Sequence, residues 1–218
     1  MEMLHELIQT PSIASTYLAE MRDESIQKDR ARFRLNLERV GSCLAWEISK
    51  HLEYQSKEVQ TPLGVAVVDV LKEQPVLATI MRAGLPMHQG MMRVFDWADH
   101  AFAAAYRQQT DGDDFEIQVD YISTPSLEGR TLILADPMLA TGASMVRVYE
   151  QLLAFGTPAH VHIACVLASR KGIDEIRSQL PSEVRIWAGA VDDTLTSKGY
   201  IVPGLGDAGD LAFGTKMT

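Results

Sequence analysis

Short apolar runs alternate with helix-like stretches through most of this chain, and this alternation limits the folds that it can adopt. The runs that read as buried strands span residues 76–81, 101–106, 116–121, 131–135, 161–167 and 184–190. Stretches with helical spacing lie at 87–95, 144–154 and 173–180. Units of strand, helix and strand build parallel sheets with right-handed crossovers. We therefore expect an α/β fold with a doubly wound, mainly parallel sheet, and ligands at the carboxyl ends of its strands.

Two flanking regions complete the expected organisation. Residues 25–54 carry apolar side chains at three- and four-residue spacing, which predicts a long amphipathic helix. The polar segment before it, from Gln9 to Ser15, could pack on its own fold or on a second subunit. Residues 199–214 are rich in glycine and show neither a helical nor a strand period. We expect one domain, with an N-terminal arm and helix (1–60), an α/β core (61–198) and a tail (199–218).

Composition excludes several classes of protein. A chain of 218 residues with 46% hydrophobic residues can bury a core without a disulfide or metal staple. Cys43 and Cys165 form no CxxC pair, which favours a reducing compartment. The net charge of -9 opposes broad binding to nucleic acid or anionic membranes. With no cationic leader and no long apolar run, the sequence predicts a soluble cytoplasmic protein, in which any phosphate site is local.

The strongest local signal follows the apolar run 131–135. The segment reads Asp136, Pro137, Met138, Leu139, Ala140, Thr141, Gly142, Ala143 and Ser144. Small side chains let backbone N–H groups approach a phosphate, and a following helix N-terminus adds positive potential. The carboxylate of Asp136 suits the vicinal hydroxyls of a sugar. The segment therefore suggests a sugar-phosphate site; the alternative is a helix cap at Thr141 with Asp136 in a solvated turn.

Two arginines also follow apolar runs. Arg82 ends the run 76–81 and is followed by Ala83 and Gly84, and Arg107 follows the run 101–106. A guanidinium at the end of a buried strand needs a partner and matches a polyanion bidentately. Pyrophosphate is a ligand of this kind. Taken alone, each arginine fits a surface ion pair better than an anion site.

The glycine-rich tail is a third candidate, from Tyr200 to Asp210. Pro203 and the nearby glycines fix an unusual backbone path. Main-chain amides and carbonyls that are exposed in this way can recognise the polar edge of a pyrimidine. A plain surface loop is the alternative.

Together these three segments resemble the uracil phosphoribosyltransferases, and the resemblance spans nearly the whole chain. Tyr106, Arg107, Tyr121 and the segment 61–64 also fall at matching positions. The resemblance implies a type I phosphoribosyltransferase fold with a C-terminal base-binding hood. It also implies a step of pyrimidine salvage, in which uracil and phosphoribosyl pyrophosphate (PRPP) give UMP and pyrophosphate, usually with magnesium. Members form dimers or tetramers, and some respond to GTP as an allosteric activator.

The resemblance also implies residue roles. Arg82 and Arg107 would hold pyrophosphate, and the segment from Asp136 to Ser144 would hold the ribose 5-phosphate. The base site would comprise Ile201, Gly206, Asp207 and Ala208. Asp207 would also face PRPP and could assist removal of a proton through water. Magnesium would bind through PRPP, because it prefers phosphate oxygens and water, and we assign no metal-ligating side chain.

Four departures from the family pattern bear on this interpretation. Pro86 and Ala143 stand where glycine is usual, Ser123 and Thr124 where Lys-Leu is common, and Leu211 where a basic residue is typical. Ala143 would cost about 1 kcal/mol only if the loop needed a positive φ there. The alternatives are a non-catalytic nucleotide sensor, a weakened transferase, or a transferase for another base.

Overall fold

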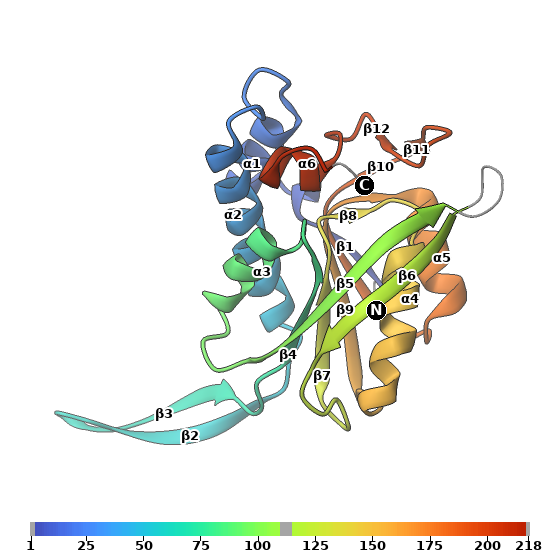
Figure 1. Cartoon of the computed structure of the whole chain (residues 1–218). Helices are drawn as coiled ribbons and strands as arrows, with labels where there is room; N and C mark the ends of the chain where they lie inside the picture. The colour runs from blue at the N-terminus through green and yellow to red at the C-terminus, as the bar shows by residue number, and fades with distance from the viewer. Residues whose placement is uncertain (1–2, 110–114, 217–218) are drawn as a thin grey trace.

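The computed structural model describes residues 3–109 and 115–216. Its main feature is an eight-stranded sheet in the order β1-β10-β9-β7-β4-β5-β6, with β8 paired to β9 (Figure 1). The strands are β1 (Leu4–Glu6), β4 (Val76–Met81), β5 (Asp99–Gln109), β6 (Phe115–Ser123), β7 (Thr131–Ala135), β8 (Met138–Leu139), β9 (His160–Ser169) and β10 (Arg185–Asp192). All pairings in this sheet are parallel except that of β5 with β6. The expected doubly wound, mainly parallel sheet is confirmed.

Helices cover both faces of the sheet (Figure 1). The helices are α1 (Ile13–Arg22), α2 (Arg30–Ser49) and α3 (Leu85–Met92) on one face, and α4 (Ala143–Leu152) and α5 (Arg170–Gln179) on the other. Successive side chains of a strand point to opposite faces. Accordingly, Leu77 and Ile133 belong to the core under α2, whereas Ala78 and Leu134 belong to the core under α4.

The long helix α2 is shorter than the predicted 25–54, and a side-chain cap sets its beginning. The carboxylate of Asp29 accepts hydrogen bonds from the N–H groups of Ala31 and Arg32 and so caps the first turn. At the other end, the chain leaves the helix and starts strand β2 (Tyr54–Thr61). The predicted apolar stripe is buried, with Phe33, Leu37, Val40, Leu44 and Ile48 all in the core.

The N-terminal segment packs on its own fold. Strand β1 extends the sheet beside β10, with Leu4 opposite Ile186, and the short helix η1 (Leu7–Gln9) follows it. Ser12 then caps α1 in a reciprocal capping box with Ser15, and α1 packs on α2. Within the predicted arm, residues 9–13 are exposed and Ala14 is buried, so only its end packs on the fold.

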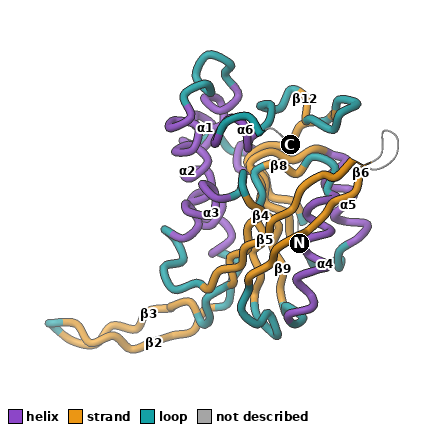
Figure 2. The backbone as a smooth tube through the Cα atoms, viewed as in Figure 1, coloured by secondary structure: helices purple, strands orange, loops and turns teal. Residues whose placement is uncertain are grey.

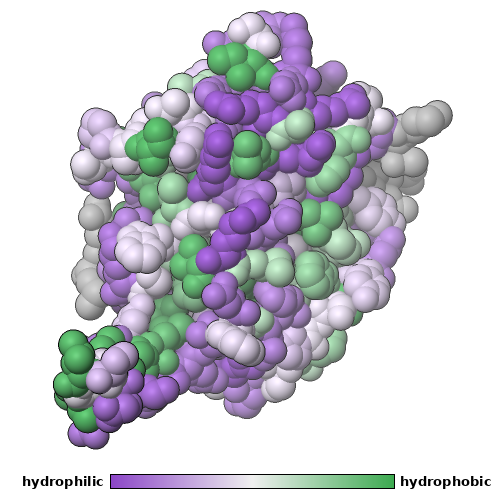
Figure 3. Space-filling view, turned by 90° about the vertical axis from the view of Figure 1, so that its left-hand side faces the viewer, coloured by the Kyte–Doolittle hydropathy of each residue, from purple (hydrophilic) through white to green (hydrophobic). Residues whose placement is uncertain are grey.

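A β-hairpin that the sequence analysis did not predict projects from the body of the protein (Figure 2). Strands β2 (Tyr54–Thr61) and β3 (Gly64–Leu71) pair along their whole length, and the tip residue Leu63 is 99% exposed. Val65 and Val67 are also exposed on β3. Figure 3 shows hydrophobic side chains gathered on this projecting end.

The tail also contains regular structure, which corrects the prediction that it has none. Thr194–Leu195 (β11) pairs with Ile201–Val202 (β12), and Ala208–Phe213 forms α6. The Asp207 side chain caps α6 by accepting a hydrogen bond from the Asp210 N–H. Elements this short are too brief for hydrophobic periodicity to reveal.

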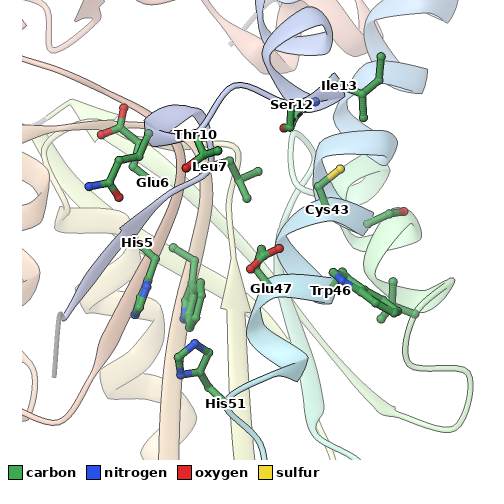
Figure 4. A pocket seen from close by; sticks show the side chains of 15 residues that line it. His5, Glu6, Leu7, Thr10, Ser12, Ile13, Cys43, Trp46, Glu47 and His51 are labelled. Carbon is green, nitrogen blue, oxygen red and sulfur yellow. Dashed lines mark hydrogen bonds between the residues drawn. The ribbon is translucent and has the colours of Figure 1, made fainter.

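A cavity of about 740 Å³ lies between the N-terminal segment and α2 (Figure 4). Its lining includes His5, Cys43, Trp46, Glu47 and His51, and it contains none of the predicted site residues. The predicted site gathers instead at the carboxyl ends of the strands.

In the described part of the chain, no helix is both long and apolar enough to cross a membrane.

Candidate active site

The site is built where the order of the strands reverses. Strands β4 and β7 are neighbours, and the chain proceeds from β4 to β5 on one side and from β7 to β9 on the other. Arg82 follows β4 and Asp136 follows β7, so both lie at this switch point, where ligands of doubly wound sheets bind. Gly84 allows the two loops to meet: a Cβ there would lie 2.2 Å from Thr79 Oγ1 and 3.4 Å from the Ala135 carbonyl oxygen.

The first half of the segment 136–144 is tied to the sheet. The Pro137 carbonyl accepts hydrogen bonds from the N–H groups of Val166 and Leu167, and β8 continues the pairing with β9. Leu139 is buried in the core. The part that can surround a phosphate is therefore the second half, from Ala140 to the start of α4.

Gly142 forms the turn into α4. Its φ of 85° favours glycine, and a Cβ there would lie 2.8 Å from the Glu175 Cβ. The residue before α4 offers no side-chain cap, although Thr141 Oγ1 lies 3.5 Å from the Ala143 nitrogen. The first-turn N–H groups of this ten-residue helix are thus available to an anion.

Two of the departures from the family pattern fit without strain. Among the described residues, positive φ occurs only at glycines, so the methyl group of Ala143 meets no backbone penalty. Pro86 lies in the first turn of α3, where a missing N–H costs no hydrogen bond. Thr124 Oγ1 donates to the Pro125 carbonyl after β6. Leu211 lies in α6.

Asp136 is the residue of the site whose pKa is shifted most. Burial raises the pKa of its carboxyl to about 7, the charge of Asp207 adds to the effect, and the Met138 N–H opposes it. Asp207 belongs to the tail, and Gly209 of the same tail lies against Arg82 and Ala83. Two carboxyl groups therefore face the same region.

The tail is joined directly to the Arg82 loop. Arg82 donates from Nη2 to Asp210 Oδ1 at 2.6 Å and from Nη1 to the Gly214 carbonyl at 2.9 Å. Gly209 passes close by: a Cβ there would lie 3.2 Å from Asp207 Oδ1 and 3.6 Å from Arg82 Nε. These contacts place the beginning of α6 over the end of β4.

A second anchor holds the tail near its proline. Arg22 makes two bonds to Asp192, of 2.7 and 2.9 Å, and a third to the Gly204 carbonyl at 3.1 Å. The Gly204 N–H also donates to Asp192, at 2.9 Å. Burial acts to raise the pKa of Asp192, but hydrogen bonds from Arg22 and Gly204 outweigh it, and the pKa lies below its ordinary value.

Comparison with known proteins identifies the family. A family model described as Uracil phosphoribosyltransferase matches residues 7–215. The chain belongs to the uracil phosphoribosyltransferase family. A protein of Porphyromonas gingivalis named uracil phosphoribosyltransferase is 48% identical over 217 residues, covering 100% of both chains. One of the same name from Methanothermobacter thermautotrophicus is 40% identical, covering 85% of each chain.

A solved structure shows the same fold. The AQ2163 protein from Aquifex aeolicus superposes with a TM-score of 0.86 at 29% identity, covering 99% of this chain and 100% of that chain. The expected type I phosphoribosyltransferase fold is thus confirmed for this member of the uracil phosphoribosyltransferase family.

The structure of this family member brings together most residues that the sequence singled out. Arg82 and Asp207 both lie beside Gly209, Asp136 follows the neighbouring strand β7, and the start of α4 lies beyond Asp136. Ile201 and Ala208 are buried in the tail, and Gly206 has a φ of 94°. The backbone of Arg107 pairs with Ile117 in β5, but its side chain lies outside the described residues.

Sequence analysis missed two supporting contacts of this uracil phosphoribosyltransferase site. Asp210 is the carboxylate that pairs with Arg82. Ser169 Oγ donates to the Ala140 carbonyl at 2.5 Å while accepting from the Gly172 N–H, so it joins the phosphate segment to α5. Ser169 could have been found as a serine immediately before a helix. Nothing in the sequence distinguishes Asp210 from Asp207.

Proposed function

We propose that this protein transfers the phosphoribosyl group of PRPP to uracil, giving UMP and pyrophosphate. The observation that carries the proposal is the joining of three remote segments at the switch point. The Arg82 loop meets the end of β7 where Gly84 lies against Ala135, and it meets the tail through Gly209 and the ion pair with Asp210. Membership of the family supports the same reaction.

The phosphate and sugar would be held by the chain after β7. The free N–H groups at the start of α4 suit the 5-phosphate, with Thr141 and Ser144 adding hydroxyl donors. Asp136, as a carboxylate, would accept hydrogen bonds from the ribose hydroxyls. The backbone of Gly142 lets this turn form close to the ligand.

Catalysis would be mainly electrostatic. Breaking the bond at the anomeric carbon builds positive charge on the ribose and negative charge on the departing pyrophosphate. Arg82 and Arg107 would stabilise that negative charge through paired N–H groups. Arg82 follows β4, whereas Arg107, expected to follow its strand, lies within β5, which extends to Gln109; β4 and β5 pair in parallel.

The tail would bind the base. The main chain around Ile201, Gly206 and Ala208 would offer donors and acceptors to the edge of uracil, as the glycine-rich path allows. Asp207, whose side chain caps α6, lies close enough to the ribose segment to affect Asp136. It would help remove the uracil proton through water.

The charges of the site fit a magnesium complex of PRPP. The charge of Asp207 adds to the raised pKa of Asp136, and a divalent cation bound with the phosphates would oppose that effect. Oxygen atoms of PRPP and water would hold the ion, and no side chain is assigned as its ligand. When bound, magnesium would neutralise part of the pyrophosphate charge.

Assembly and setting complete the proposal. We propose a homo-oligomer, a dimer or a tetramer, and the exposed apolar hairpin supports it. Both cysteines are free, which supports a cytoplasmic location. Activation by GTP stays a prediction from the family resemblance.

The test is an assay of product formation with PRPP and a panel of bases. We expect UMP from uracil, and no comparable product from orotate, hypoxanthine or adenine. Arg107→Ala should lower kcat/KM by roughly 10²-fold, the scale of losing one transition-state donor. Product from another base alone would overturn the assignment of uracil, and binding of UMP without turnover would instead indicate a nucleotide sensor.

A further inference from the structure

Arg82, the residue expected to hold pyrophosphate, is paired with the C-terminal tail. Its Nη2 donates to Asp210 Oδ1 at 2.6 Å, and its Nη1 donates to the Gly214 carbonyl at 2.9 Å. A carboxylate and a phosphate present oxygen atoms to a guanidinium in much the same way. Asp210 therefore uses a donor of Arg82 that pyrophosphate would also use.

The position of Asp210 is set by its helix. It lies in the first turn of α6, where its own N–H donates to Asp207 Oδ1 at 2.9 Å. Its carboxylate also accepts from the Lys216 N–H at 3.4 Å. Negative charge is favourable in the first turn of a helix. The carboxylate is thus held towards Arg82 by the fold of the tail.

The pair is accessible enough to exchange. The side chain of Arg82 is 37% exposed and that of Asp210 is 29% exposed. Ion pairs that water can reach are screened and contribute little to stability. Pyrophosphate carries several negative charges and can engage a guanidinium with two oxygens, so it can displace a single carboxylate.

We propose that Asp210 competes with pyrophosphate for Arg82, so that filling the pyrophosphate site releases one of the ties between the tail and the Arg82 loop. The inference rests on the proposed function. Asp210 is then a positioning residue that acts through Arg82: paired, it holds the tail over the end of β4. After exchange, the tail keeps the bond from Arg34 Nη1 to the Ala212 carbonyl, of 2.7 Å.

The direct test is calorimetric titration of inorganic pyrophosphate, with magnesium chloride, into the full-length protein and its Asp210→Asn variant. Asparagine keeps the size and an acceptor oxygen but removes the competing charge. We expect the variant to bind pyrophosphate about five-fold more tightly, the scale of an accessible ion pair. The matched control is Arg34→Ala, which loosens the tail without changing the partner of Arg82, and which should give no gain in affinity.

Steady-state kinetics provide a second readout. Asp210→Asn should lower the KM for PRPP, because Arg82 is free to bind it, and raise the KM for uracil, because the tail is held less firmly. Arg34→Ala should raise only the KM for uracil. A purely structural role for Asp210 would raise both KM values, and would not produce opposite changes.

Unchanged or weaker pyrophosphate affinity in Asp210→Asn would overturn the inference. Thermal unfolding of each variant checks that it folds, and Asp210→Ser offers a second way to remove the charge; failure of both variants to fold would show that Asp210 serves folding and not competition. If the unmodified protein forms no UMP and binds no pyrophosphate, the proposed function fails as well. If the unmodified protein forms UMP but Asp210→Asn binds pyrophosphate no more tightly, the competition is overturned and the proposed function stands.

Discussion

Asp136 links the chemistry of the site to the stability of the protein. Its pKa is about 7 in the fold, against 3.8 for an ordinary aspartate. Between these values the folded protein keeps a proton that the unfolded chain has lost, so the free energy of unfolding falls as the pH rises from about 4 to about 7. Above that range the full penalty of ionising this carboxyl in the fold is present.

Asp136→Asn should remove this pH dependence. At pH 8 we expect the variant to be more stable than the original protein by roughly 1 to 3 kcal/mol, because one pKa unit corresponds to about 1.4 kcal/mol. At pH 4 the difference should nearly vanish. Urea unfolding followed by circular dichroism at both pH values measures it, and an equal difference at pH 4 and pH 8 would contradict the assignment to Asp136.

The same substitution should weaken substrate binding. Loss of the charged acceptor for the ribose hydroxyls should cost roughly 1 to 3 kcal/mol in affinity for PRPP. A protein that gains stability and loses affinity indicates a residue kept for its ligand. Fluorescence or calorimetric titration with PRPP measures the loss, and unchanged affinity would remove Asp136 from the ribose site.

Gly142 is the residue whose backbone the phosphate turn most depends on. With φ at 85° and Glu175 2.8 Å from the position of a Cβ, Gly142→Ala adds a left-handed penalty of about 1 kcal/mol and a steric clash. We expect a loss of stability of about 1 to 3 kcal/mol and a higher KM for PRPP. Gly129→Ala is the matched control, because its φ is also positive, at 70°, but nothing lies within 4 Å of its Cβ position. It should lose stability alone.

Site residues could be predicted from the sequence where neighbouring residues along the chain define their role. Asp136 and Gly142 stand out because a strand end, a small-residue turn and a helix start follow one another in the sequence. Asp210 could not be singled out in this way. It shares a short segment with Asp207, and only the fold shows that Asp210 faces Arg82 while Asp207 caps the helix.

At the scale of elements, the tail depends on anchors from the N-terminal region. Arg22 of α1 reaches both Asp192 at the end of β10 and the Gly204 carbonyl. Helix α1 therefore positions the segment that is proposed to bind uracil. Arg22 lies 170 positions from Asp192 and 182 positions from Gly204 in the sequence, so no local pattern predicts these contacts.

Arg22→Ala should loosen the tail. It leaves the buried carboxylate of Asp192 with the Gly204 N–H as its partner, so we expect a loss of stability of about 1 to 3 kcal/mol. The KM for uracil should rise more than the KM for PRPP, because the phosphate segment has other supports. Arg32→Ala is the control: Arg32 makes a similar two-bond pair with Glu20 that does not touch the tail. An equal effect on uracil in both variants would contradict the anchor.

The strands and helices of the core were predictable because burial imposes their periods, and the predicted run 131–135 coincides with β7. Other elements do not follow that rule. Strands β2 and β3 are exposed on both faces, so they show no alternation between apolar and polar residues. Hydrophobic periodicity arises where one face of a strand is buried within the chain, so it does not reveal the exposed strands β2 and β3.

At the scale of the whole molecule, this hairpin is the feature that the chain leaves unburied. A two-stranded hairpin is only marginally stable by itself, and exposed apolar side chains on it are typical of a surface that contacts another protein. Val65 and Val67 lie on one face of β3 with 60% and 68% exposure, whereas Lys57 pairs with Val68 on the other face. In the proposed homo-oligomer, the face with the two valines would be covered.

The double variant Val65→Ser and Val67→Ser should therefore weaken assembly without unfolding the protein. Exposed substitutions change the stability of a subunit by about 0.5 kcal/mol or less, whereas burial of a valine in an interface contributes about 1.5 kcal/mol, so losing two should raise the dissociation constant roughly 100-fold. Sedimentation velocity over a range of concentrations measures it, with Lys57→Ser as the control on the opposite face. If the double variant assembles as strongly as the original protein, this face of the hairpin does not hold the assembly together. The same conclusion follows if the double variant and Lys57→Ser are both monomers.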